Sequence, residues 1–379
     1  MSAPTGTGHI LCIVGARPNF MKIAPIMRAF AQPESSLSAR LLHTGQHYDT
    51  AMKHAFFDQL HIPEPDIDLE VGSGSHAQQT AEIMKRFEPV LDELSPVAVL
   101  VVGDVNSTIA CALVAVKKGI PVIHVEAGLR SGDRQMPEEI NRILTDQLSE
   151  LLFITEADAG ENLDREGIPR DKVHFVGNVL IDTLLYNMED AVPAATTLAN
   201  SGDGLVLDHR GYGLVTLHRP SNVDDPLVLQ RLLRVLGSIS ERTPLLFPMH
   251  PRTARRIEDS RLSDLLGSFP IKILPPQGYL EMLGLMREAR IVLTDSGGIQ
   301  EETTALGVPC VTLRENTERP ITVEQGTNTL VGTNIDKIMA CYELIVSQGG
   351  KAGRVPDKWD GSAAQRIVDE INRWAAGRT

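Results

Sequence analysis

Two acidic residues follow apolar segments at the positions where buried strands should end. Glu126 lies in VIHVEAGLRSGDRQMPEEINR (122–142), which opens with β-branched residues, and Asp104 follows the apolar run VAVLVVG (97–103). The carboxyl ends of parallel strands meet at one edge of a sheet, so the two side chains should face a common crevice. Carboxylates in such a place can donate and accept protons during a reaction. We therefore predict an acid/base site that contains Asp104 and Glu126.

The next acidic pair has a simpler explanation. Pro137 suits the first turn of a helix, and Glu138 and Glu139 complement the helix dipole. This explains one or both glutamates without catalysis. Residue types and spacing therefore leave the role of Glu138 open, and they predict that Glu139 is a dipole partner and Arg142 is structural.

A glycine-rich turn indicates phosphate binding. The segment DSGGIQEETTALG (295–307) follows the apolar run RIVLT, and Gly297 and Gly298 would weaken the first turn of an ordinary helix. They suit a place where a phosphate must approach the free N–H groups and the positive dipole end of a helix. An ordinary helix capped by Asp295 or Ser296 is the alternative. Glu301 and Glu302 lie in the first turns of the same helix. One of them could accept hydrogen bonds from a ribose, while the other serves only the helix dipole.

Cationic and imidazole side chains follow other apolar runs. Arg17 and Lys22 lie in GARPNFMK (15–22), where the planar fork of an arginine suits a phosphate, although a solvated arginine in a tight turn is the simpler explanation. His218 and His250 each end an apolar run, and each has a proline and an arginine nearby. We interpret both histidines as ligand-facing residues, not as a metal pair.

No segment has a convincing cofactor motif. GSGSHA (72–77) matches G-x-G-x-x-A, but the preceding DIDLEV alternates polar and apolar residues, unlike the buried strand of an NAD site. GARPNFMK lacks the GK[ST] of a Walker loop. The four cysteines are far apart and form no CxxC pair. We therefore predict neither NAD nor a metal.

Charge and hydropathy exclude other classes of partner. The chain has 379 residues and a formal net charge of −13, which argues against nucleic acid or an anionic membrane surface. The N-terminal apolar run HILCIVG has no basic leader, and no segment is long enough to span a membrane. These features predict a soluble, cytoplasmic protein.

Two series of short apolar runs must position the candidate residues. The first comprises residues 10–15, 39–45, 97–103, 121–127, 151–155 and 173–177, and the second comprises 212–218, 244–250, 271–276, 290–296, 310–315 and 329–332. Helical periodicity separates the runs, and a polar stretch at about 188–211 separates the series. This alternation predicts an α/β fold with two Rossmann-like, doubly wound domains, whose ligands bind at the carboxyl ends of the strands.

Ordered motifs across most of the chain resemble one family. They are GARPNFMKIAP, TGQHYD, GDVNST, HVEAGLRSGDRQMPEEINR, HRPSN, PQGYLE, LTDSGGIQEE and TERPITVEQGTN. Together they resemble the bacterial non-hydrolysing UDP-N-acetylglucosamine 2-epimerases. The resemblance implies a GT-B fold with the active site in the cleft between the domains. It places residues 1–180 plus 360–379, with a returning C-terminal helix, in the first domain and 181–359 in the UDP-binding domain.

The resemblance also implies roles for individual residues. It gives catalytic roles to Asp104, Glu126, Glu138 and His218. It implies that the UDP-sugar is held by Arg17 and Lys22 near the diphosphate, Arg219, His250, Gln277 beside the uracil, Ser296, Gly297 and Gly298 on the phosphate, Glu302 on the ribose, and Arg319. It further implies a homodimer that needs neither NAD nor metal and makes precursors of surface polysaccharides.

The family's chemistry implies that UDP leaves first, giving 2-acetamidoglucal, and then adds back to invert C2. Cations must hold the departing diphosphate, while carboxylates stabilise the cationic sugar and move the proton. Some members bind a second, regulatory UDP-N-acetylglucosamine, for which Gln46 and His250 would be suitable. Three alternatives stay open: an epimerase of a UDP-diacetamido uronic acid, a GT-B glycosyltransferase, and a hydrolysing epimerase. A nucleotide-sugar sensor would need the phosphate groups but not the carboxylates.

Overall fold

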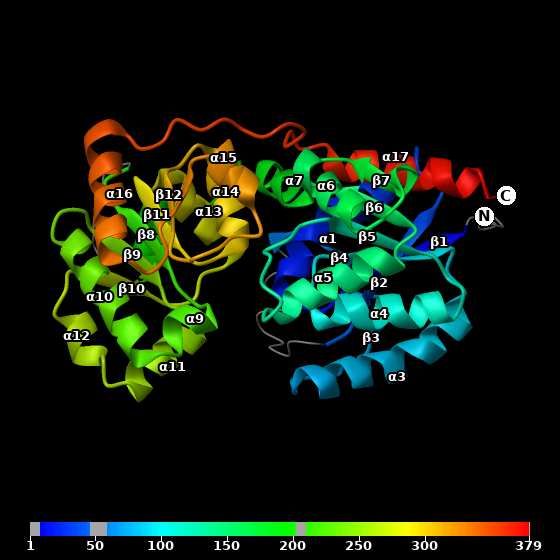
Figure 1. Cartoon of the computed structure of the whole chain (residues 1–379), viewed down its shortest axis with the longest axis horizontal. Helices are drawn as coiled ribbons and strands as arrows, with labels where there is room; N and C mark the ends of the chain where they lie inside the picture. Colours follow the sequence, from blue (N-terminus) through cyan, green and yellow to red (C-terminus); the bar gives the residue numbers. More distant parts are fainter. Residues whose placement is uncertain (1–7, 46–58, 202–209, 379) are drawn as a thin grey trace. The chain divides into compact units, whose positions relative to one another are not determined.

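The computed structural model describes residues 8–45, 59–201 and 210–378, without the side chain of Arg17. The chain forms two compact units (Figure 1). Unit 1 comprises Met1–Tyr186 and Asp357–Thr379, and unit 2 comprises Asn187–Pro356. The TGQHYD motif, except for its first two residues, lies outside the described residues, as does Gln46.

Unit 1 contains a seven-stranded parallel sheet in the order β3-β2-β1-β4-β5-β6-β7. Its strands are β1 (His9–Val14), β2 (Ser38–His43), β3 (Ile67–Asp68), β4 (Ala98–Val102), β5 (Val122–Ala127), β6 (Leu151–Ile154) and β7 (Val173–Phe175). The sequence prediction missed only β3, a two-residue edge strand within DIDLEV. An edge strand this short leaves too little buried, β-branched sequence for a strand pattern to be recognised.

Helices complete unit 1, and one of them comes from the end of the chain. They are α1 (Arg17–Phe30), α3 (His76–Leu94), α4 (Asn106–Lys117), α5 (Pro137–Leu148), α6 (Ala157–Arg165), the 3₁₀ turn η1 (Arg170–Lys172), α7 (Val179–Tyr186) and α17 (Ala363–Ala376). Helix α17 packs against α1 and α7. The Asp182 carboxylate accepts hydrogen bonds from the backbone N–H groups of Ala363 (3.1 Å) and Ala364 (2.7 Å). The first turn of α17 is therefore capped by a residue of α7.

Unit 2 contains a six-stranded parallel sheet in the order β10-β9-β8-β11-β12-β13. Counted within the unit this is the order 3-2-1-4-5-6, that of a Rossmann domain. The strands are β8 (Gly213–Thr216), β9 (Leu245–Pro248), β10 (Ile271–Leu274), β11 (Ile291–Thr294), β12 (Cys310–Thr312) and β13 (Asn328–Leu330). Each overlaps one of the six apolar runs of the second series, and β13 begins one residue before its run.

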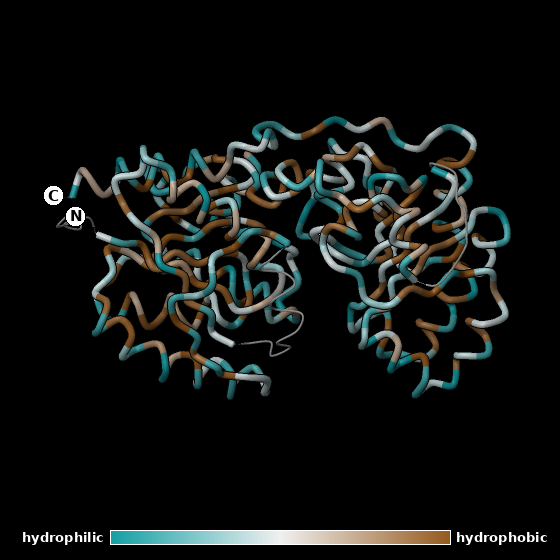
Figure 2. The backbone as a smooth tube through the Cα atoms, turned by 180° about the vertical axis from the view of Figure 1, so that it is seen from behind, coloured by the Kyte–Doolittle hydropathy of each residue, from teal (hydrophilic) through white to brown (hydrophobic). Residues whose placement is uncertain are grey.

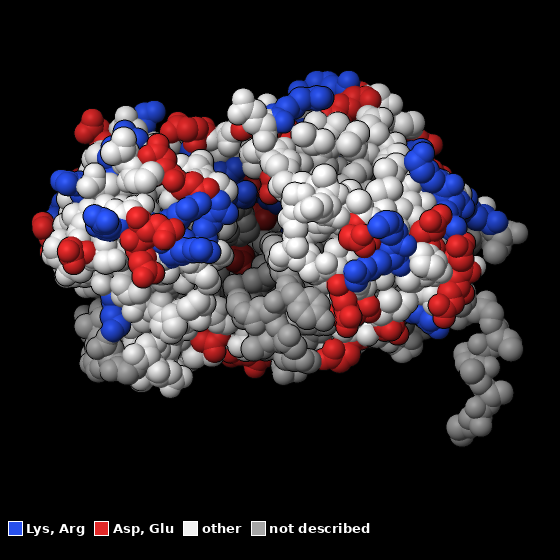
Figure 3. Space-filling model, turned by 90° about the horizontal axis from the view of Figure 1, so that it is seen from below, with Lys and Arg blue, Asp and Glu red and all other residues white. Residues whose placement is uncertain are grey.

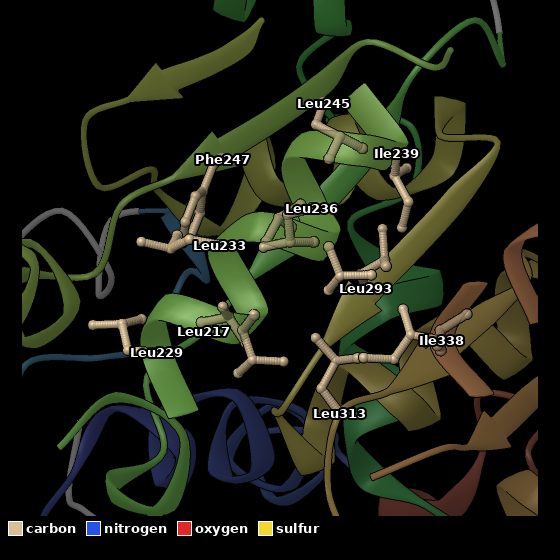
Figure 4. Packing of buried hydrophobic residues seen from close by; sticks show 14 of the residues in the cluster. Leu217, Leu229, Leu233, Leu236, Ile239, Leu245, Phe247, Leu293, Leu313 and Ile338 are labelled. Carbon is tan, nitrogen blue, oxygen red and sulfur yellow. The ribbon is translucent and has the colours of Figure 1, made fainter. Parts of the chain in front are cut away.

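The helices of unit 2 alternate with these strands. They are α8 (Ala194–Asn200), α9 (Pro220–Val223), α10 (Pro226–Ser240), α11 (Pro251–Asp259), α12 (Ser263–Gly267), α13 (Tyr279–Glu288), α14 (Gly297–Leu306), α15 (Pro320–Glu324) and α16 (Ile335–Gln348). Leu229, Leu233 and Leu236 of α10 repeat at helical spacing and pack into a fully buried cluster with Phe247 and Leu293 (Figure 4). Truncating one such leucine to alanine costs about 2–5 kcal/mol of unfolding free energy, so this core holds the strand ends rigidly.

The remaining surface features are modest. Apolar and polar stretches alternate along the backbone of both units (Figure 2). The face shown in Figure 3 mixes acidic and basic side chains in small groups. Within the described ranges, no helix is long and apolar enough to cross a bilayer, and no group of three or more His, Cys, Asp or Glu side chains could hold a metal ion.

Candidate active site

Glu126 stands out in unit 1 because its backbone is strained. Its φ angle is +73°, a left-handed conformation that non-glycine residues with a branched or long side chain seldom adopt. The residue interrupts the pairing of β5 with β6, whose register shifts between Val125 and Ala127. A bulge of this kind redirects a side chain at the end of a strand. Only 5% of the Glu126 side chain is exposed.

Lys22 forms an ion pair with this carboxylate. The Nζ atom of Lys22 contacts Oε2 of Glu126, and the lysine side chain is itself buried. A Cβ atom at Gly103 would lie 3.2 Å from both charged atoms. The sequence placed Lys22 near the diphosphate, whereas its partner in unit 1 is a candidate catalytic carboxylate.

Asn19 fixes the turn that presents Lys22, and the sequence interpretation missed it. Its Oδ1 atom accepts hydrogen bonds from the N–H groups of Gly15 (3.1 Å) and Ala16 (3.0 Å), and its Nδ2 donates to the carbonyl of Val102 (3.0 Å). These bonds tie the GARPNFMK turn to the end of β4. The sequence signal that could have identified it is an asparagine directly after Pro18 in a predicted strand-to-helix turn.

Asp104 also has a cationic partner. The Nη2 atom of Arg142 donates to Oδ2 of Asp104 at 2.6 Å, while Nη1 contacts Glu139. The buried Glu139 carboxylate accepts from the N–H groups of Ser131 (3.0 Å) and Gly132 (2.9 Å). Glu139 is therefore more than a dipole partner, because it anchors a loop and orients the arginine that reaches Asp104.

Glu138 differs from the other carboxylates of unit 1. It lies in the first turn of α5 and is half-buried. It forms no hydrogen bond or ion pair with any residue that the structure describes. Its carboxylate is thus available to a ligand, and the structure does not bring it into contact with Asp104 or Glu126.

A buried histidine network supports this edge of the sheet and was also missed. The Nδ1 atom of His124 lies 2.6 Å from Asp146, and Nε2 lies 2.9 Å from the carbonyl oxygen of Gly103. Burial disfavours an ionised Asp146, but His124 and Arg130 outweigh it and lower the pKa of this carboxyl. The network holds the residue that precedes Asp104.

In unit 2, Asp295 organises the end of β8. The buried carboxylate accepts from the backbone N–H groups of His218 (3.0 Å) and Arg219 (2.9 Å), from Nδ2 of Asn222 (3.1 Å) and from Nδ1 of His218 (2.9 Å). Burial opposes its ionisation, yet the hydrogen bonds and charge of His218 and the N–H groups lower its pKa. The alternative of an ordinary side-chain cap on α14 does not hold: Ser296 occupies the N-cap position but no side chain caps the helix, and Asp295 turns toward the HRPSN loop.

The two predicted histidines of unit 2 lie near each other. The ring centroids of His218 and His250 are 5.5 Å apart. The Nδ1 atom of His250 accepts from the N–H of Arg252 at 3.1 Å and caps α11. Because Asp295 holds Nδ1 of His218, whose side chain is 36% exposed, the Nε2 edge of this ring is the one left for a ligand.

The N-terminus of α14 provides backbone donors for an anion. Ser296 is its N-cap residue, and its own N–H is held by the Thr294 hydroxyl at 3.0 Å. Gly297 follows, and a Cβ atom there would lie 2.9 Å from Oε1 of Glu318. A larger residue at this position would force the buried Glu318 carboxylate to shift. The start of α14, from Ser296 to Gly298, is thus a helix end without a side-chain cap, the kind of place where anions bind.

The glutamates of α14 have separate partners. Glu302 is buried beside the Tyr279 hydroxyl, whose pKa is raised well above its usual value by burial and by this carboxylate. Oε1 of Glu301 lies 2.8 Å from Nε of Arg319, so Glu301 is more than a dipole partner. Gln277 is half-buried in the loop before α13 and donates to the carbonyl of Pro275 at 2.7 Å.

Both units thus carry charged groups at the carboxyl ends of a parallel sheet, an arrangement typical of nucleotide-binding α/β proteins. A family model for UDP-N-acetylglucosamine 2-epimerase matches residues 30–372. The chain belongs to this family of isomerases and has its GT-B fold of two Rossmann-like domains. The fold and family predicted from the motifs are confirmed.

Several relatives define how close the match is. The UDP-N-acetylglucosamine 2-epimerase of Methanocaldococcus jannaschii is 43% identical over 94% of this chain and 96% of its own. A UDP-2,3-diacetamido-2,3-dideoxy-D-glucuronate 2-epimerase of Pseudomonas aeruginosa is 42% identical over 87% of this chain and 90% of its own. The M. jannaschii crystal structure in complex with UDP-GlcNAc and UDP has a TM-score of 0.88 and 42% identity, covering 96% of this chain and 99% of that one.

Proposed function

We propose that this protein interconverts UDP-N-acetylglucosamine and UDP-N-acetylmannosamine by inverting C2 of the sugar, as the name of its M. jannaschii relative indicates for that enzyme. The observation that carries the proposal is Glu126, a buried carboxylate presented by strained backbone and paired with a lysine. Strain of this kind persists where a side chain must be held in a particular place. A protein that only sensed a nucleotide sugar would not need it.

The proposed reaction begins with the loss of UDP. The C2 proton of an N-acetyl sugar has no neighbouring carbonyl to acidify it, but it becomes more acidic as the C1–O bond breaks and positive charge grows at C1. A carboxylate then removes the C2 proton, leaving 2-acetamidoglucal and UDP. Protonation of C2 on the opposite face and re-addition of UDP at C1 complete the inversion and leave the enzyme unchanged.

Residues of unit 1 would perform the proton transfers. Glu126, Asp104 and Glu138 are the candidate acids and bases. Lys22 forms an ion pair with Glu126, and Arg142 forms one with Asp104, so one oxygen of each carboxylate has a fixed position. Glu138 has no such partner among the described residues and would contact the substrate directly. Reaction on two faces of the sugar needs more than one acid/base group.

Residues of unit 2 would hold the nucleotide. The N–H groups at the start of α14 and the Nε2 edge of His218 can stabilise the charge of the departing diphosphate. Glu302 would accept hydrogen bonds from the ribose, and Gln277 would lie beside the uracil. Arg219, His250 and Arg319 would complete this set, and Arg17 of unit 1 is a further candidate for the diphosphate.

Incubation of the purified protein with UDP-N-acetylglucosamine alone tests this function. Proton NMR should show the manno epimer, with no added acceptor, NAD or metal. Free N-acetylmannosamine and UDP would instead indicate a hydrolysing epimerase, and a requirement for an acceptor would indicate a glycosyltransferase. We further propose a cytoplasmic homodimer that supplies precursors of surface polysaccharides, and sedimentation analysis at micromolar concentration tests the dimer.

One alternative substrate has specific support. The P. aeruginosa relative that acts on UDP-2,3-diacetamido-2,3-dideoxy-D-glucuronate is almost as similar in sequence as the M. jannaschii epimerase. A parallel incubation with this uronic acid decides between them through kcat/KM. The proposal predicts the larger value for UDP-N-acetylglucosamine.

A further inference from the structure

A carboxylate lies close to the proposed phosphate site in unit 2. Glu318 is buried, and its Oε1 atom would be 2.9 Å from a Cβ atom at Gly297, in the first turn of α14. Its Oε2 accepts from Nη2 of Arg314 at 2.8 Å, and its Oε1 accepts from Nη2 of Arg219 at 3.4 Å. The Glu318 carboxylate, an anion of the protein itself, therefore lies close to the N-terminus of α14, which has no side-chain cap.

The side-chain ion pairs around Glu318 contain more guanidinium groups than carboxylates. Three guanidinium groups, those of Arg219, Arg314 and Arg319, face the carboxylates of Glu301 and Glu318, which leaves one positive charge in excess. Arg314 is only 7% exposed, and its Nη1 atom finds no hydrogen-bond partner among the described residues. A buried guanidinium with an unused donor beside a helix N-terminus is a strong attractor for an anion.

We propose that Glu318 is a positioning residue and built-in counter-charge, which acts through Arg219 and Arg314 to limit how tightly unit 2 holds the diphosphate. The inference rests on the proposed function, because it takes the diphosphate of a UDP-sugar as the anion. Without Glu318, the donors that now bind its carboxylate would turn to the phosphate oxygens. Binding the substrate and the transition state equally tightly lowers KM but does not raise kcat, so an upper limit on the affinity does not slow the reaction.

One observation shows that Glu318 stays charged, and another shows that its loop is held in place. The neighbouring arginines overcome the cost of burial and keep the pKa of Glu318 far below its usual value, so it stays ionised. The preceding Thr317 hydroxyl donates to Gln300 of α14 at 2.7 Å and accepts from the N–H of Arg319 at 3.0 Å. Gln300 in turn donates to the carbonyl of Ser296 at 3.2 Å. The loop that carries Glu318 is thus fastened to the helix whose N-terminus it faces.

Isothermal titration with UDP tests the proposal on variants of opposite charge. Glu318→Gln keeps the shape and an acceptor for the arginines but removes the negative charge, so the Kd for UDP should fall roughly three- to tenfold, with a parallel fall in the KM for UDP-N-acetylglucosamine. Arg314→Gln removes a positive charge and should raise the Kd by a similar factor. The double variant restores the original net charge and should return the Kd to within about twofold of wild type.

A matched control comes from the same loop. Glu315 is exposed, and Glu315→Gln should leave the Kd for UDP unchanged. An unchanged or raised Kd for Glu318→Gln would overturn the proposal. That outcome is the one expected if Glu318 only supports the structure of the site, because its loss would then weaken UDP binding or leave it unchanged. If this variant does not fold, Arg314→Gln and the double variant decide, and failure of the double variant to recover affinity would overturn it. A wild-type protein that does not bind UDP would instead contradict the proposed function.

Discussion

The two units have related parallel sheets but place opposite chemistry at their strand ends. In unit 1 the ends of β4 and β5 present carboxylates, and each has a cation as its partner, Lys22 for Glu126 and Arg142 for Asp104. In unit 2 the ends of β8 and β11 present backbone donors and an imidazole, while the buried Asp295 holds them in place. Carboxylates at the strand ends are thus candidate acids and bases in unit 1, whereas the carboxylate of Asp295 in unit 2 holds other residues in place.

The difference shows that topology fixes where a site lies and local residues decide what it does. Both sheets direct their strand ends toward loops, as doubly wound sheets do. The carboxylates that could react have a cationic partner, and one further feature sets each apart: Glu126 has strained backbone, and the side chain of Asp104 is 27% exposed. Full burial and several N–H partners mark those that support others, such as Asp295. Substitutions in either unit can test this difference.

The largest expected effect is on unit 1. Glu126→Gln should lower kcat by at least about 10²–10³-fold, because a positioned general acid or base contributes this much. The Kd for UDP should stay within about twofold of wild type, since most of the groups proposed to hold the nucleotide belong to unit 2. Coupled assays and titration calorimetry measure the two quantities. Unchanged turnover would remove Glu126 from the catalytic set.

The matching substitution in unit 2 should act on stability and on UDP affinity together. Asp295→Asn leaves buried donors of the HRPSN loop without their ionised partner, and should cost about 3 kcal/mol of unfolding free energy at pH 7. Chemical unfolding measures this cost, and calorimetry should show weaker UDP binding.

The effect of Asp295→Asn should also depend on pH. The pKa of Asp295 is lowered in the folded protein, so its ionised form stabilises the fold above the unfolded value of about 4, and this stabilisation is lost as the pH falls further. The difference between wild type and variant should therefore be constant from pH 7 to pH 5 and shrink at lower pH. A difference that does not change down to pH 3 would contradict the role assigned to this carboxylate.

A smaller effect is expected where the backbone approaches the ion pair of unit 1. Gly103 has a φ of +65°, and a Cβ atom there would lie 3.2 Å from the charged atoms of Lys22 and Glu126. Gly103→Ala should cost about 1–2 kcal/mol of stability and lower kcat about tenfold. Gly119 is a matched control, because its φ is +72° and nothing lies within 4 Å of the Cβ position. Gly119→Ala should show the stability loss alone, and equal kcat values for the two variants would refute the steric argument.

The smallest effect concerns the helix that returns to unit 1. Asp182→Ala removes the cap of α17 and should lower the unfolding free energy by about 1 kcal/mol without changing kcat/KM. Urea unfolding checks this, with Asp369→Ala on the exposed face of the same helix as the control. A large loss of activity would show that α17 acts on the reaction and not only on the fold.

The sequence predicted the architecture well because buried parallel strands have a strong pattern. All six runs of the second series became strands, and in the first series only β3 was missed, since an edge strand of two residues has no such pattern. The motifs also identified the family, and they drew attention to Glu126 where a core strand ends.

The partners of the site residues could not be predicted, because they come from distant parts of the chain. Lys22 and Glu126 are 104 positions apart, and Arg219 and Glu318 are 99 apart. His124 lies inside a strand pattern, where a buried histidine has no local signal of its partners. The role of Asp295 could not be predicted for the same reason, since its donors follow another strand and do not belong to the next helix.

In the proposed mechanism, the carboxylates of unit 1 invert C2 through proton exchange with solvent. Incubation of UDP-N-acetylglucosamine with the wild-type protein in D₂O, followed by proton NMR of the epimer, measures this exchange directly. We expect UDP-N-acetylmannosamine with deuterium at C2. Epimerised product that retains its original C2 hydrogen would rule out this mechanism.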